Sequence, residues 1–397
     1  MAMAAEGGAE TARRAGRPAS LELLFDLVYV FALVSLTKTL ADDVSWTNVA
    51  RTVVLLLAFT LVWSLTTWAA DSIGLDRPLV RWQIIGVAAA SLLLASAAPD
   101  AFGERGLLFA VTYVTIHLGS GTYYLVAHVL SGSDPAEPRR SVRVLLWEAV
   151  AAVGWIGGAL VDGPARLAIW ALTVALEYAA VVLGWPLPRI GRSRAREWRL
   201  TGERVAERYR QFVIIALGVS LLVIGTTFSQ KEYTLDRGVA LAVVFTTVVL
   251  MWRIYIYRAG ELLTEAIARS TDPSLLTQSA AFTHLIMVAG IAGSAVTGHL
   301  VVGRPFGDTP PSWAAVILGA PALFLVGRGL LDYTVFGRIS RSRVAGLALL
   351  GALAPVSTLL PPAVRALLAT AVLALIAAAN LVSTRLHARD PRPPMLG

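Results

Sequence analysis

The chain has 397 residues, of which 56% are hydrophobic and only 15% are charged, and its mean hydropathy is +0.67. Because soluble domains carry roughly 25% charged residues, this composition excludes a soluble globular protein and indicates an α-helical membrane protein. The formal charge of +8 does not indicate a nucleic-acid partner, because the basic residues lie in short loops between apolar segments. The absence of cysteine excludes disulfides, thiolate metal ligands and thiol nucleophiles.

Apolar segments recur along the whole chain, and each reaches about 27 Å or more as an α-helix. The prediction is an all-α polytopic membrane protein with about twelve transmembrane helices. In chain order the predicted helices are 21–40, 49–70, 80–98, 105–130, 143–162, 164–184, 209–228, 236–258, 280–301, 312–332, 341–360 and 363–385.

The positions of the basic residues predict the orientation of these helices. With the N-terminus in the cytoplasm, roughly three-quarters of the 34 Lys and Arg residues fall in cytoplasmic segments. Both ends, 1–20 and 386–397, are therefore predicted to be cytoplasmic tails. The arginine-rich segment 185–208 is the longest cytoplasmic linker, and it separates two six-helix halves, 21–184 and 209–385.

The linker is expected to rest on anionic lipid headgroups, with a regulatory or substrate-phosphate role as the alternative. A faint internal repeat supports the two halves, because aligning Glu22 with Glu207 also aligns Val28 with Val213. Six helices in each half would give the halves the same orientation and place a site at their interface.

The first predicted helix, Leu21–Leu40, contains two acids near its start. Glu22 and Asp26 are four residues apart and share one helical face with Tyr29 and Leu33. A carboxylate in hydrocarbon is unfavourable by about 2.5–3.5 kcal/mol, so this face is predicted to point into the protein or toward water.

Other ionisable groups inside the predicted helices are candidates for proton transfer or catalysis. His117 follows Tyr113 by one turn, Glu177 has no basic partner in its own helix, and His284 begins the ninth helix. Each has a structural alternative, such as a hydrogen-bonded core side chain or, for Glu22, a helix-start acid. Glu148 is expected to pair with arginines near the cytoplasmic end.

Three features favour packing or binding. Trp63, Trp68 and Tyr113 are candidates for lining a substrate cavity; the interfacial aromatic belt is the alternative for Trp68 and Trp82, whereas Trp63 lies too deep for it. Gly154–Gly158 is a GxxxG pair typical of helix packing. Arg328 and Asp332 are spaced for an ion pair within one helix.

The sequence contains no HExxH pattern, no histidines three or four residues apart, no Walker loop and no dinucleotide fingerprint. We therefore expect neither a metal site nor a cofactor.

The segment Leu21–Leu40 (LELLFDLVYVFALVSLTKTL) resembles the opening helix of the bacterial low temperature requirement A family, whose pattern is ELFFDLVFVFA followed by a polar tail. Further similarities follow in the family's order over nearly the whole chain, at Trp63, Trp68 and Asp71, Pro99–Phe102, Phe109, Ala110 and Tyr113, Glu207–Gly225 and His284–Gly290. The resemblance implies a multi-pass protein of the bacterial cytoplasmic membrane that is linked to growth in the cold. It implies no settled biochemical reaction.

The chain departs from the family pattern at three places. Leu217-Gly218-Val219 stands where the family usually has LGE, the usual histidine near Lys38 is absent, and so is the arginine often found near His117. This chain is therefore either specialised or has dropped a shared activity.

Two main functions remain open, together with a non-catalytic membrane scaffold. In a proton-linked transporter or exporter of a small molecule, Asp26, Glu177 and His284 would exchange protons. In an intramembrane enzyme acting on a lipid or isoprenoid, Asp71 and Asp76 would hold a Mg²⁺-diphosphate group while Glu177 starts a cyclisation or isomerisation. Helix-end capping explains the two aspartates equally well. The expected partners are membrane lipids and a small-molecule or lipid substrate, and the oligomeric state is not predicted.

Overall fold

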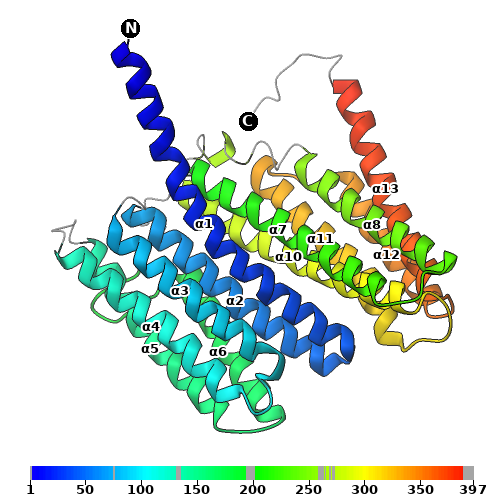
Figure 1. The fold of residues 1–397 in the computed structure, drawn as a ribbon, viewed down its shortest axis with the longest axis horizontal. Helices are drawn as coiled ribbons and strands as arrows, with labels where there is room; N and C mark the ends of the chain where they lie inside the picture. The colour runs from blue at the N-terminus through cyan, green and yellow to red at the C-terminus, as the bar shows by residue number, and fades with distance from the viewer. Residues whose placement is uncertain are drawn as a thin grey trace. The chain divides into compact units, whose positions relative to one another are not determined.

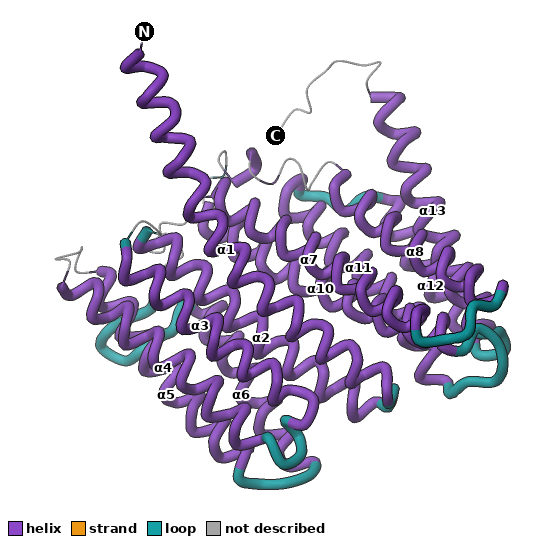
Figure 2. The backbone as a smooth tube through the Cα atoms, in the orientation of Figure 1, coloured by secondary structure: helices purple, strands orange, loops and turns teal. Residues whose placement is uncertain are grey.

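The computed structural model of the chain describes residues 2–74, 77–130, 136–193, 202–257, 263, 265–267, 270 and 273–387. Over these ranges the structure is built from helices joined by loops and turns, and it contains no strand (Figure 2). The all-α prediction is therefore confirmed.

Twelve long α-helices lie in the described ranges, and each overlaps one of the predicted segments. In chain order they are α1 (Ala2–Asp42), α2 (Trp46–Ile73), α3 (Pro78–Ala97), α4 (Gly106–Leu130), α5 (Ala136–Ala159), α6 (Pro164–Leu183), α7 (Gly202–Ser229), α8 (Leu235–Tyr255), α10 (Pro273–Gly303), α11 (Pro311–Phe336), α12 (Arg341–Ser357) and α13 (Pro362–His387) (Figure 1). A short 3₁₀ helix, Ala98–Asp100, follows α3.

The first helix begins much earlier than predicted. Residues 2–20, which the sequence analysis treated as a polar tail, continue α1 in one run of 41 residues. This stretch is rich in alanine, which has the highest helix propensity of all residues.

Ten of the helices among the described residues are long and apolar enough to cross a membrane. The other two are α4, where Thr112, His117 and Ser120 interrupt the apolar residues, and α12, which has 17 residues. The chain is thus a multi-pass membrane protein by length and composition. The count of twelve crossings and the cytoplasmic position of both termini stay predictions.

The chain divides into two compact units. The first is formed by Met1–Leu40, Trp46–Val205 and Asp272–Leu275, and the second by Ala41–Ser45, Ala206–Thr271 and Leu276–Gly397. The first unit therefore holds most of α1 and all of α2–α6, and α7 and the later helices lie mainly in the second. The duplication that the sequence suggested stays a prediction.

Within the first unit, α4 packs against both α3 and α5, α5 packs against α6, and α2 contacts α3, α4 and α6. The contact between α5 and α6 depends on the GxxxG pair. A Cβ atom at Gly154 would overlap the Thr173 side chain, and one at Gly158 would overlap the Trp170 ring. The two helix backbones therefore approach closely, as the sequence predicted for this motif.

The second unit contains the predicted ion pair and an additional arginine. Arg328 and Asp332 form an ion pair one turn apart on α11, and both side chains are buried. The Arg343 Nε atom from α12 lies 3.4 Å from the same carboxylate, and its Nη1 atom donates a hydrogen bond to the Asn380 Oδ1 atom at 2.6 Å. The arginines compensate the buried charge of Asp332, and their contacts join α11, α12 and α13.

We expect the substitution Gly154→Leu to lower the free energy of unfolding by about 1–3 kcal/mol, because the new side chain would have to fit where Thr173 already lies. Gly157→Leu is the matched control, since no atom lies within 4 Å of a Cβ built there. Thermal unfolding of both variants in detergent checks this. Equal melting temperatures would contradict the close α5–α6 contact.

The predicted orientation can be tested with single cysteines, because the natural chain contains none. With the N-terminus in the cytoplasm, a membrane-impermeant maleimide should label the exposed position Asp43→Cys in intact spheroplasts. The exposed position Arg192→Cys, in the linker, should be labelled only after the membrane is permeabilised. The reverse pattern would overturn the orientation.

Candidate functional site

A buried carboxylate lies at the centre of the first unit. Glu177 is two turns before the end of α6, and its side chain is 4% exposed. The Tyr113 hydroxyl from α4 and the Trp155 indole from α5 both donate hydrogen bonds to it, each 3.2 Å from both carboxylate oxygens. Among the described residues no Lys or Arg forms an ion pair with Glu177, so neutral donors alone surround it.

A histidine-glutamate pair lies beside this carboxylate. The His117 Nδ1 atom of α4 is 3.0 Å from the Glu148 Oε2 atom of α5, and both side chains are buried. This corrects the expectation that Glu148 pairs with arginines, because histidine is its ion-pair partner in the described part of the chain. The other ring nitrogen of His117, Nε2, has no hydrogen-bond partner among those residues.

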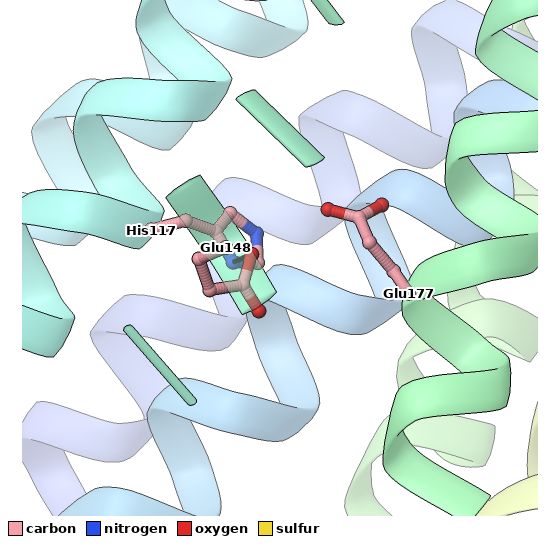
Figure 3. Close-up of side chains that lie close together, drawn as sticks. All are labelled: His117, Glu148 and Glu177. Carbon is pink, nitrogen blue, oxygen red and sulfur yellow. Dashed lines mark ion pairs between the residues drawn. The ribbon is translucent and has the colours of Figure 1, made fainter. Parts of the chain in front are cut away.

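The three ionisable side chains form one cluster, which we call the acid-histidine cluster (Figure 3). It consists of His117, Glu148 and Glu177, and one potential ligand atom from each lies within 4.8 Å of the others. One imidazole nitrogen and two carboxylates are donors that a divalent metal ion uses. His117 and Glu177 were predicted singly as candidates, but their meeting with Glu148 was not, because the three residues come from three helices and show no local spacing.

Helical periodicity explains why the cluster forms. Phe109, Tyr113 and His117 follow one another at intervals of four on α4, so their side chains share one face. On the facing helices, Trp155 lies two turns after Glu148, and Trp170 two turns before Glu177. The rings pack together, with centroids 4.4 Å apart for Tyr113 and Trp155 and 5.2 Å apart for Trp155 and Trp170.

A cavity of about 60 Å³ between α2, α4 and α5 reaches the cluster. It touches His117 and Glu148 but not Glu177. Its other polar lining includes the ionisable side chains of His128 and Arg140 as well as Ser120 and Ser141. Most of its remaining lining is apolar, and its polar groups lie beside the acid-histidine cluster, where a water molecule could be held.

A second buried carboxylate lies between α1 and α2. The Trp63 Nε1 atom donates a hydrogen bond to the Asp26 Oδ1 atom at 2.9 Å, and neither residue is more than 1% exposed. Tyr29 and Leu33 are also buried. The predicted inward face of the first helix is therefore present from Asp26 onward.

The opposite face of this helix is exposed at Leu23, Leu24 and Leu27. Glu22 is half-buried, one turn before Asp26. Trp68 is buried on α2, but neither Trp63 nor Trp68 lines the cavity beside the cluster.

The two aspartates that could have held a diphosphate group are not found together in the described structure. The Asp71 Oδ1 atom lies 3.4 Å from the Arg204 Nη1 atom, and the Asp71 side chain is only 4% exposed. Asp76 lies outside the described residues. The observed contact gives Asp71 a structural partner and leaves the enzyme hypothesis without specific support.

His284 lies in the second unit, on α10, and is 1% exposed. Its Nδ1 atom is 2.7 Å from the carbonyl oxygen of Ala280, and its Nε2 atom is 3.1 Å from the Tyr255 hydroxyl. A carbonyl oxygen can only accept, so Nδ1 carries the proton and Nε2 accepts from the tyrosine. Both nitrogens of this histidine are thus engaged, in contrast to those of His117.

We expect Trp63→Phe to lower the free energy of unfolding by about 1–3 kcal/mol, because the buried Asp26 carboxylate loses a donor while the aromatic packing is largely kept. Trp82→Phe is the control, since Trp82 is 71% exposed. Denaturant or thermal unfolding in detergent measures the difference. If both substitutions had the same effect, the hydrogen bond would not stabilise the first unit.

Comparisons with known proteins show which family the amino-acid sequence belongs to. The uncharacterized protein RA0937 of Rhizobium meliloti (strain 1021) is 34% identical over 334 residues, which cover 83% of this chain and 81% of that protein. Among solved structures, none matches the chain. The model of the bacterial low temperature requirement A protein matches residues 17–378. The chain therefore belongs to the bacterial low temperature requirement A (LtrA) family.

Proposed function

We infer that this LtrA-family protein is a proton-linked secondary transporter of a small molecule in the bacterial cytoplasmic membrane. The acid-histidine cluster would be its coupling site. The observation that carries this conclusion is the position of Glu177, buried among neutral donors and close to a second carboxylate and a histidine.

The electrostatics of the cluster favour an exchangeable cation. Burying a charged carboxylate costs several kcal/mol unless a cation compensates it, and Glu148 and Glu177 are both buried. His117 can compensate one of the two negative charges. A proton that is taken up from water and later released can compensate the other, which is the behaviour that a coupling site needs.

The position of the cavity indicates which side chain of the cluster would receive a proton first. Because it touches His117 and Glu148 but not Glu177, a proton from the cavity would meet the histidine-glutamate pair first. From there the distance to the Glu177 carboxylate is within 4.8 Å. A small rearrangement of these side chains, or one water molecule, would bridge that gap.

Proteoliposomes with a pH-sensitive dye inside test this function. An imposed potassium diffusion potential should drive proton movement through the wild-type protein, and Glu177→Gln should reduce the rate at least tenfold. Glutamine keeps the size of the side chain and an acceptor oxygen for Tyr113 and Trp155, but its amide cannot take up and release a proton near neutral pH.

Glu137→Gln is the matched control. Glu137 also pairs with a histidine, His128, at 3.1 Å across α4 and α5, but it does not belong to the acid-histidine cluster. Proton movement at the wild-type rate in Glu177→Gln would overturn the transporter. Loss of turnover of a lipid substrate in Asp71→Asn, without any ion gradient, would support the enzyme instead.

A further inference from the structure

We propose that the acid-histidine cluster binds a divalent first-row transition-metal ion, such as Mn²⁺, Fe²⁺, Co²⁺ or Zn²⁺. The ion would be held by one nitrogen of His117 and one carboxylate oxygen each from Glu148 and Glu177. Since it names the ion that competes with protons at the same side chains, this inference rests on the proposed coupling site.

Geometry is the first argument for a metal ion. The three ligand atoms lie within 4.8 Å of one another. Around a single tetrahedral ion with bonds of about 2.0–2.2 Å, ligand atoms lie roughly 3.3–3.6 Å apart, so the most distant pair would have to approach by about 1 Å to complete the site. The side chains are already directed toward one another from α4, α5 and α6 (Figure 3).

An unsatisfied ligand atom is the second argument. His117 is 6% exposed, and its Nε2 atom has no hydrogen-bond partner among the described residues. The Glu148 Oε2 atom likewise has no hydrogen-bond partner among these residues, so two of the three ligand side chains carry such an atom. His284, by contrast, has both ring nitrogens engaged by protein groups. The His117 ring therefore retains a free donor position for a ligand.

Charge is the third argument. Two carboxylates and a neutral imidazole carry two negative charges in a buried site, and one divalent cation cancels both. In the described part of the chain, no Lys or Arg pairs with any of the three side chains. Tyr113 and Trp155 hold the Glu177 carboxylate in place, as the hydrogen-bonding neighbours of metal ligands usually do.

The donor set selects the class of ion. An imidazole nitrogen favours transition metals over Mg²⁺ and Ca²⁺, and the absence of thiolate ligands disfavours soft ions such as Cu⁺. The adjoining cavity touches His117 and Glu148, so two of the three ligand side chains border open space. Three protein ligands also leave coordination positions open for water or another small ligand.

Co²⁺ added to the purified full-length protein in detergent tests the proposal, because its visible absorption depends on the coordinating atoms. The wild type should develop a d–d absorption band that saturates at one Co²⁺ per chain and decreases when Zn²⁺ is added. His117→Gln and Glu177→Gln should each weaken binding at least tenfold, whereas Glu137→Gln should bind like the wild type. Size-exclusion elution establishes that each variant is folded.

Two outcomes would overturn the proposal. One is no Co²⁺ band in the wild type at millimolar Co²⁺, and the other is the same affinity in the site variants as in the wild type. Proton movement in proteoliposomes containing a chelator separates this inference from the proposed function. Proton movement without Co²⁺ binding would support the transporter and reject the metal site. Co²⁺ binding without proton movement would support the metal site and reject the transporter.

Discussion

The cost of placing a charged side chain in an interior without water governs the polar contacts of both units. Several kcal/mol are lost for each buried ion that lacks a partner, so every such group must find a donor, an acceptor or an opposite charge. The chain meets this requirement by contacts between helices. Asp26 joins α1 to α2, Glu177 joins α6 to α4 and α5, and Asp332 joins α11 to α12.

The two units meet the requirement in different ways. In the second unit, arginines compensate the buried Asp332, and the buried His284 uses both of its nitrogens. With two arginines around one carboxylate, such a network has no excess negative charge that would attract a further cation. In the first unit, Glu177 is held by neutral donors and His117 has a nitrogen without a partner among the described residues. The first unit therefore has the groups that exchange of a cation requires.

The positions of the helices were predicted well from the sequence, because a membrane-spanning helix consists of one continuous stretch of mainly apolar residues. The pairs within one helix could also be predicted from the sequence, because Arg328 and Asp332 are one turn apart and Gly154 and Gly158 form a recognised packing motif. The predicted helix ends were less accurate, as the early start of α1 shows. A polar, alanine-rich segment can also form a helix, so the end of the apolar stretch does not mark the end of the helix.

The candidate site could be predicted only in part. His117, Tyr113 and Glu177 were recognised one by one as ionisable or polar groups in apolar helices. Their meeting with Glu148 depends on how three helices are rotated about their axes, which no periodicity within one helix specifies. For the same reason the tryptophan at position 63 was recognised as too deep for the membrane interface, but its bond to Asp26 was not foreseen.

The close approach of α5 to α6 has a mechanical consequence. The Trp170 indole donates a hydrogen bond to the backbone carbonyl of Trp155 at 2.9 Å, in the region where the glycines at 154 and 158 let the two helices touch. Sliding of one helix along the other would break this bond and press side chains into backbone. The two helices are thus coupled as a stiff pair that carries both glutamates, and α4 is tied to this pair through the Tyr113–Glu177 hydrogen bond and the His117–Glu148 contact. Any cycle of opening and closing in this unit would accordingly keep the two backbones that carry the acids at a fixed spacing.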